Sequence, residues 1–210
     1  MKKLIVALGL VFFAVQTGLA ATAPRGDASA GKSKSTTCVA CHAEDGNSAV
    51  PSFPKLAGLG EKYLFQQMKY IRDGLRPVAQ MAGQVDNKSD QDLADIAAYF
   101  NSKARTGNTA DPALVELGER VYRAGIPERN VAACIACHAP NGSGNGPAGF
   151  PALGGQHAEY IAQQLKMYRK GYQDPEGRVT GGDTKIMRSN AFGLSDMEIE
   201  AVASYASGLR

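Results

Sequence analysis

The sequence predicts an all-α protein built from two tandem domains of one fold, and two observations lead to this prediction. The first is an internal repeat, in which four segments of the first half recur in the same order in the second. The second is that apolar residues recur at helical spacing in both halves, while no stretch alternates like a β-strand. The repeated pairs are CVACHAEDGN and CIACHAPNGS (38–47, 134–143), FPKLAG and FPALGG (53–58, 150–155), YLFQQMKYIRDG and YIAQQLKMYRKG (63–74, 160–171), and MAGQVDNKSDQDLADIAAYF and MRSNAFGLSDMEIEAVASYA (81–100, 187–206).

The spacing of the repeats suggests where the domains meet. The offset is 96 or 97 residues for the first three pairs and 106 for the last, so the second half carries nine extra residues around DPEGRVTGG. The junction is expected within 106–111. This gives an N-terminal domain over 21–107 and a C-terminal domain over 108–210.

Residues 1–20 have the features of a cleaved signal peptide. A positive start is followed by an apolar stretch over 4–15, and small residues precede a cleavage site after Ala20. Cleavage after Ala23 is an alternative, and an uncleaved membrane anchor is another. Twelve apolar residues are short for a span, which needs roughly 20. The mature chain is therefore expected to be exported to the periplasm.

Each half is expected to contain three or more helices. In the second half, Asp111 is a plausible N-cap with Pro112 at the first helical position, and the first half has a shorter equivalent starting near Asp27. The middle helices are predicted over 61–73 and 158–170.

The ends of the later helices carry further signals. Gly74 and Gly171 follow the middle helices, where a left-handed C-terminal cap belongs. The last helices are predicted to start at Ser89 and Ser195, each with an acidic residue three positions on, as in a capping box.

Composition narrows the possible functions. The chain has 23 Lys and Arg against 20 Asp and Glu, and 44% of its residues are hydrophobic. Neither half is basic enough to suggest binding to nucleic acid. The apolar content of each half is modest, so a large buried cofactor would complete the core.

All four cysteines belong to two C-x-x-C-H motifs, the signature of covalent heme c attachment. Two thiols on one helical turn can add to the vinyl groups along one heme edge, and the following histidine can ligate the iron. We predict thioethers at Cys38, Cys41, Cys134 and Cys137, with His42 and His138 as axial ligands, and hence two heme c groups per chain.

Three other interpretations of the cysteines were weighed. A four-cysteine zinc site requires both pairs to converge across 96 residues and leaves the histidines without a role. A thioredoxin-like redox pair requires a βαβ context, which the sequence lacks. Disulfides within each C-x-x-C would do little to staple a fold.

The repeat also selects the sixth ligand of each iron. Met68, Met167 and Met197 align with residues other than methionine, whereas Met81 and Met187 align with each other. These two are expected in loops before the last helices, 39 and 49 residues after their histidines. Core filling is the common use of methionine, but the pairing favours axial ligation.

Other repeated residues suggest supporting roles. Pro54 and Pro151 follow the two histidines, and their carbonyls are candidate acceptors for the second ring N–H of each ligand. The prolines could instead only shape the loop. His157 aligns with Gly60 and is expected to be a surface or packing residue.

Two tyrosine pairs also recur on the predicted helices. They are Tyr63 with Tyr160, and Tyr99 with Tyr205. Packing is the favoured role for both pairs, with hydrogen bonding to heme propionates as the alternative.

On these motifs, the chain resembles the diheme cytochrome c4 family over nearly the whole mature sequence. The resemblance implies two class I cytochrome c domains about a pseudo-twofold axis, with heme propionates near their interface. It implies axial roles for His42, Met81, His138 and Met187, and orienting carbonyls at Pro54 and Pro151. It also implies electron transfer in the bacterial periplasm, often toward a terminal oxidase, with membrane association in some members.

A six-coordinate iron has no open position for substrate, so the chain is expected to be an electron carrier and not an enzyme. Expected partners are redox proteins such as a terminal oxidase or a small periplasmic carrier, with peripheral membrane association possible. The alternatives are a diheme peroxidase, which needs a displaceable ligand, and a fixed heme subunit of a respiratory complex.

Overall fold

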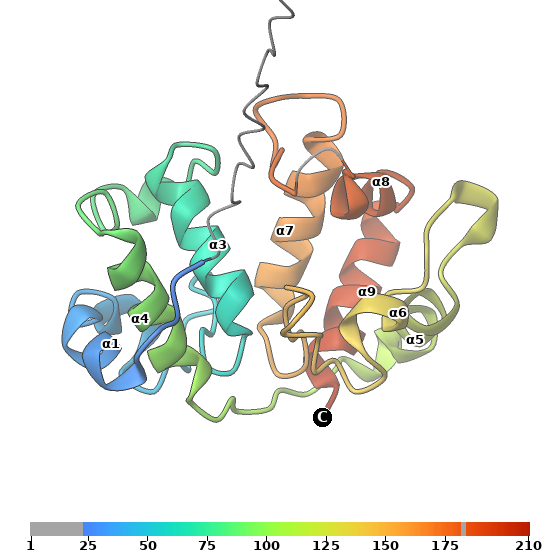
Figure 1. The fold of residues 1–210 in the computed structure, drawn as a ribbon. Helices are drawn as coiled ribbons and strands as arrows, with labels where there is room; N and C mark the ends of the chain where they lie inside the picture. The colour runs from blue at the N-terminus through green and yellow to red at the C-terminus, as the bar shows by residue number, and fades with distance from the viewer. Residues whose placement is uncertain (1–22, 182–183) are drawn as a thin grey trace, which may run out of the picture.

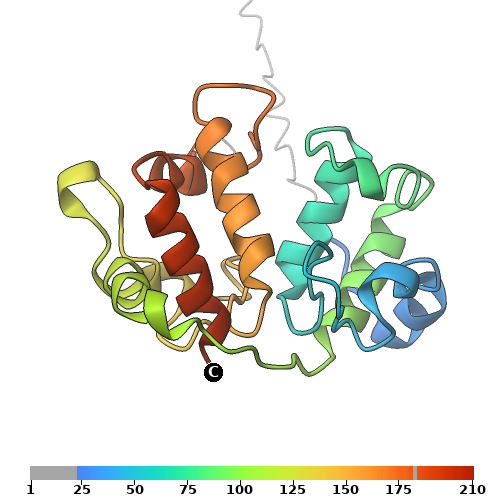
Figure 2. The ribbon, with the colours of Figure 1, turned by 180° about the vertical axis from the view of Figure 1, so that it is seen from behind.

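The structure is a computed structural model that describes residues 23–181 and 184–210, so the predicted signal peptide (1–20) lies outside the described residues. Two helical lobes lie side by side and are joined by an extended linker, as Figures 1 and 2 show from opposite sides. Within the described residues, extended pairing is limited to two isolated bridges, Ile126 with Val131 and Asn145 with Phe150. The all-α prediction is therefore confirmed.

The two lobes share one order of main helices, and the C-terminal lobe has two further 3₁₀ turns. The N-terminal lobe contains α1 (Ala28–Lys34), α2 (Val39–His42), α3 (Glu61–Arg72), the 3₁₀ turn η1 (Ala79–Met81) and α4 (Asp90–Asn101). The C-terminal lobe contains η2 (Pro112–Leu114), α5 (Val115–Ala124), η3 (Pro127–Arg129), α6 (Ile135–His138), α7 (Ala158–Lys170), α8 (Ile186–Phe192) and α9 (Asp196–Gly208). In the described residues, no helix is long and apolar enough to cross a membrane.

The start signals predicted from the sequence are present. Asp27 accepts hydrogen bonds from the first turn of α1, and Asp111 does so for η2, which leads into α5. Both last helices begin with complete capping boxes at Ser89 and Ser195.

One of the two predicted glycine caps is wrong. Gly74 takes a φ of +72°, as expected, but Gly171 has a φ of −66°. The following loop folds back on the helix end, and a Cβ on Gly171 would lie 2.3 Å from the carbonyl oxygen of Arg178. Glycine is needed there for close backbone approach and not for a left-handed conformation.

The first and last helices of each lobe cross at a glycine. A Cβ on Gly31 of α1 would lie 2.0 Å from the Asp95 carbonyl oxygen of α4, and one on Gly118 of α5 would lie 2.3 Å from the Ala201 carbonyl oxygen of α9. The core of each lobe lies around its last helix, where Leu93 and Ile199 are fully buried.

Polar contacts hold the lobes in one arrangement, with the repeat-related helices α3 and α7 facing each other (Figures 1 and 2). The side chain of Gln156 accepts from the backbone N–H of Lys55 at 2.9 Å and donates to its carbonyl at 2.8 Å. The partly buried guanidinium of Arg105 donates to carbonyls of both lobes, at Ala57 and Ala152. Bidentate and buried contacts of this kind fix the lobes, and with them the distance between the two sites.

Candidate heme sites

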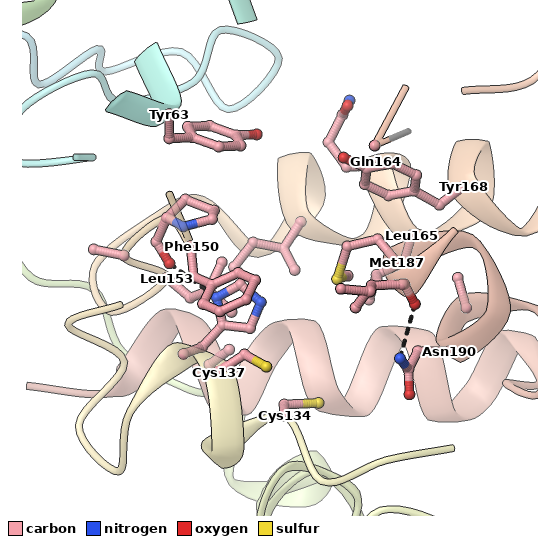
Figure 3. Close-up of a pocket in the computed structure, with 18 of the residues that line it drawn as sticks. Tyr63, Cys134, Cys137, Phe150, Leu153, Gln164, Leu165, Tyr168, Met187 and Asn190 are labelled. Carbon is pink, nitrogen blue, oxygen red and sulfur yellow. Dashed lines mark hydrogen bonds between the residues drawn. The ribbon is translucent and has the colours of Figure 1, made fainter. Parts of the chain in front are cut away.

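The C-terminal lobe contains a cavity of about 540 Å³ that is enclosed mainly by apolar side chains. Cys134 and Cys137 lie at one end of it, while Tyr63, Gln164 and Tyr168 lie at the opposite end (Figure 3). Met187 extends into the cavity between these ends. The C-x-x-C-H motif and the paired methionine of this half therefore line one pocket.

Both motif histidines are oriented in the same way. His42 and His138 end the one-turn helices α2 and α6, and each is only 6% exposed. Their Nδ1–H groups donate to the carbonyls of Pro54 and Pro151, each at 2.9 Å. Burial lowers the pKa of both imidazoles, which favours the neutral form with Nε2 available as a ligand.

An unusual backbone turn follows each histidine. Ala43 and Ala139 have φ values of +63° and +65°, in a region that residues with a Cβ rarely adopt. The hydroxyl of Tyr122 donates to the Ala139 carbonyl at 2.7 Å, and that of Tyr99 donates to the Glu44 carbonyl at 2.9 Å. Tyr99 thus has a hydrogen-bonding role next to the turn, in addition to packing.

The methionines lie in short helical segments, and the prediction that both lie in loops is wrong. Met81 is the last residue of η1, and Met187 lies in the first turn of α8. In α8, the side chain of Asn190 donates to the Ile186 carbonyl and accepts from the Ala132 N–H, which ties this helix to the segment before the C-x-x-C-H motif.

In the N-terminal lobe, Cys38 and Met81 are partly buried against the same core cluster. Met68 packs against that cluster as well, whereas Met197 is 69% exposed. The side chain of His157 lies between the lobes, with Nε2 2.8 Å from the Ser48 carbonyl oxygen, which agrees with its expected packing role.

Cys38, Cys134 and Cys137 are partly buried, while Cys41 is exposed. Burial raises the pKa of Cys134 to about 11 and also raises that of Cys38. Such thiols are protonated at neutral pH and are poor redox nucleophiles. Within 23–181 and 184–210, no three His, Cys, Asp or Glu side chains gather as a metal site, so the cysteine pairs do not converge on the alternative zinc site. The apolar cavity with sulfur, imidazole and thioether groups on its walls fits a heme attached at one edge.

Sequence reasoning missed two residues of the C-terminal site, Asn190 and Arg178. Arg178 lines the cavity from the segment that carries the nine extra residues, and it is only 4% exposed. Its signal was present in the sequence, because Arg76 and Arg178 both stand between a middle helix and its paired methionine. The insertion conceals this correspondence by shifting the offset.

Comparisons with known proteins identify the family. The cytochrome c family profile matches residues 28–103 and 115–209. Cytochrome c4 from Pseudomonas aeruginosa is 52% identical over the full length of both chains. The solved structure of reduced recombinant cytochrome c4 from Pseudomonas stutzeri superposes with a TM-score of 0.82 at 49% identity, and the match covers 88% of this chain and all of that one. The chain belongs to the cytochrome c4 family.

As a cytochrome c4 family member, the chain is a diheme electron carrier with two covalently bound heme c groups. A more distant relative is the thiosulfate dehydrogenase electron acceptor from Thiomonas intermedia. It is 32% identical over 96% of this chain and 87% of its own length.

Proposed function

We propose that this cytochrome c4 family member is a periplasmic one-electron carrier in which each iron has a histidine and a methionine ligand. The ligand pairs are His42 with Met81 and His138 with Met187, and the thioethers form at Cys38, Cys41, Cys134 and Cys137. One observation carries the proposal. In both lobes the histidine Nδ1–H donates to a proline carbonyl, which leaves Nε2 free as a ligand. In the C-terminal lobe, His138 and Met187 line the same cavity.

Each heme, when bound, supplies a one-electron iron couple. The protein residues hold its surroundings constant through the transfer. The carbonyls of Pro54 and Pro151 keep both imidazoles in one orientation and tautomer. Tyr122 and Asn190 restrain the backbone on the two sides of the C-terminal cavity. Little rearrangement then accompanies a change of charge, which suits fast electron exchange.

Filled axial positions leave no place for substrate, so the protein is proposed to carry electrons and not to catalyse a reaction. The domain assignment of 21–107 and 108–210 places one complete ligand set in each domain. The family matches over 28–103 and 115–209 support that division.

The proposed partners are other redox proteins. A terminal oxidase is the proposed acceptor, and the signal-peptide pattern of residues 1–20 supports a periplasmic location. A relative named as the electron acceptor of a thiosulfate dehydrogenase supports a dehydrogenase as one kind of donor. Peripheral association with a membrane complex is compatible with both roles.

Near-infrared spectroscopy of the oxidised protein tests the ligand assignment. The methionine–ferric charge-transfer band is expected at two-heme intensity, and Met81→Ala and Met187→Ala are each expected to lose about half of it. Met197→Ala is the matched control, because its side chain is largely exposed, and it should leave the band unchanged. A band that survives in both ligand variants would contradict the assignment.

Peroxide turnover tests the enzyme alternative. The wild-type protein is expected to show no hydrogen peroxide reduction above the level of a methionine-ligated monoheme cytochrome. Peroxide turnover by the wild-type protein that falls in Met81→Ala or Met187→Ala would favour a peroxidase instead.

A further inference from the structure

Two arginines meet at the boundary between the lobes, in a cluster whose described members include no acidic side chain. We call this group the interdomain arginine cluster; it consists of Arg76, Arg178, Tyr63, Tyr160, Gln67 and Gln164. The tyrosines and the glutamines are repeat mates, each pair being 97 residues apart.

The arginines are also structural mates, although the alignment hides it. The backbone N–H of Arg76 donates to the Tyr70 carbonyl at 2.9 Å, and that of Arg178 donates to the Met167 carbonyl at 2.8 Å. Tyr70 and Met167 are equivalent positions of α3 and α7, also 97 residues apart. The insertion therefore places five of its residues before the arginine and four after it, and leaves the arginine in the same position.

Each arginine reaches across to the other lobe. Arg76 donates to the hydroxyl of Tyr160 at 3.0 Å and to Oε1 of Gln164 at 2.9 Å. Arg178 donates to the hydroxyl of Tyr63 at 3.3 Å and to Oε1 of Gln67. Each also binds the glutamine of its own lobe, so both glutamine oxygens are shared by two guanidinium groups.

All of these partners are neutral. Among the described residues, neither arginine forms an ion pair with a carboxylate within 4.0 Å. The Arg178 side chain is almost fully buried and lies over the Tyr168 ring at 4.2 Å. Enclosing two like charges is unfavourable unless an anion is bound nearby, so the arrangement among the described residues suits a bound anionic group.

The position of the cluster identifies the anion. It adjoins the end of the C-terminal cavity that lies opposite Cys134 and Cys137, where Figure 3 shows Tyr63, Gln164 and Tyr168. A heme attached through its vinyl edge to those cysteines carries its two propionate carboxylates on the opposite edge. Guanidinium groups bind carboxylates through paired N–H donors, and the symmetry of the cluster presents one arginine to each lobe.

We propose that Arg76 and Arg178 together bind propionate carboxylates of both hemes and raise both reduction potentials. This inference rests on the proposed covalent attachment and axial ligation. A fixed positive charge near the heme edge favours the reduced form, in which the iron centre carries one positive charge less. Since Arg178 lines the C-terminal cavity and is the more buried of the two, it acts mainly on the C-terminal heme.

Redox titration of purified holoprotein tests this proposal, with each heme followed by its own NMR-shifted methyl signals. Arg178→Gln is expected to lower the reduction potential of the C-terminal heme by about 59 mV. For one electron, this is a tenfold change in the equilibrium constant for reduction. The shift at the N-terminal heme should be smaller, and Arg76→Gln should reverse this order. Arg178→Lys should recover part of the shift, because it restores charge without the paired donors.

Arg120→Gln is the matched control, since it removes one positive charge from an exposed site on α5. It should leave both potentials nearly unchanged. Unchanged potentials in Arg178→Gln and Arg76→Gln, with both hemes and the methionine band intact, would overturn the proposal and leave the cluster a purely structural bridge. Potentials that follow the phosphate concentration would overturn it in favour of a dissolved anion.

Two results keep this test separate from that of the proposed function. A wild-type protein without two hemes or without the methionine band would disprove the function itself. If Arg178→Gln does not assemble, Arg178→Lys and Arg76→Gln decide the matter by the same criterion, because Arg76 is only half-buried and its loss perturbs the fold less.

Discussion

The two lobes handle the heme in the same way but pack their first helix differently. In both, the histidine Nδ1 lies 2.9 Å from a proline carbonyl, and an alanine with positive φ follows the histidine. These features are local, spanning little more than a dozen residues of chain. The packing between α1 and α4, and between α5 and α9, joins residues more than sixty positions apart, and there the lobes diverge.

In the N-terminal lobe the first helix is held by polar contacts. Gly31 is the only buried residue of α1, and the buried Asp95 of α4 binds Lys34 at 2.6 Å and the Asp27 N–H at 2.8 Å. In the C-terminal lobe Ala201 takes the place of Asp95, and α5 buries Val121 and Tyr122 instead. One architecture is thus stabilised by a buried carboxylate in one lobe and by apolar contacts in the other, without a change at the histidines.

The largest expected effect comes from filling the two helix crossings. Gly118→Ala would push a Cβ against the Ala201 carbonyl oxygen, and a loss of about 3 kcal/mol in unfolding free energy is expected. Gly31→Ala should cost less, because α1 has no other buried residue and can move away from α4. The measurement is guanidinium unfolding of the holoprotein followed by circular dichroism.

Gly146→Ala serves as the control for both substitutions, since a Cβ there would meet no atom within 4 Å. It should change stability by less than about 0.5 kcal/mol. An equal loss in Gly31→Ala and Gly118→Ala would show that the two crossings are equally rigid, against the comparison drawn above.

The next largest effect is the dependence of stability on pH, through the buried carboxylate of Asp95. Burial opposes ionisation of Asp95, but hydrogen bonds from Lys34, from the Asp27 N–H and from Gln91 outweigh it and lower the pKa below its usual value. A carboxyl whose pKa is lowered in the folded state stabilises the protein at neutral pH, and this contribution is lost as the pH falls below about 4. Asp95→Ala should cost about 1–3 kcal/mol at pH 7, since it leaves buried donors without an acceptor.

The difference in stability between wild type and Asp95→Ala should shrink on going from pH 7 to pH 3. Thermal unfolding in matched buffers across this range measures it, with Glu116→Ala on the exposed surface of α5 as the control. A difference that stays constant with pH would mean that Asp95 acts through packing and not through its charge.

The smallest effect should be the same in both lobes. Ser89→Ala and Ser195→Ala each remove the hydroxyl of a complete capping box, and each should cost about 1 kcal/mol. Ser33→Ala is a suitable control, because its exposed hydroxyl bonds only within α1. A much larger loss in one lobe would reveal a difference at the last helices that the geometry does not show.

Much of this organisation could be predicted from residues close together in the chain. The last helices begin at Ser89 and Ser195 as expected, and the middle helices match their predicted ranges to within one residue. These signals act within one helical turn, where hydrogen-bond geometry depends on local sequence. The errors arose at Gly171, beside the inserted residues, and at Met81 and Met187, which lie in short helical segments and not in loops.

The sequence by itself determined the number of domains, their helical class and which cysteines, histidines and methionines correspond between the halves. A repeat and a C-x-x-C-H motif depend only on the order of residues along the chain. Only the tertiary structure decided that Met187 sits on a helix tied by Asn190, and that Asp95 takes the place of Ala201. It alone brought Arg76 and Arg178 together, with no carboxylate beside them among the described residues. That meeting depends on the docking of two lobes and on a loop that returns an arginine to the same carbonyl after nine inserted residues, and such long-range packing leaves no periodic trace in the chain.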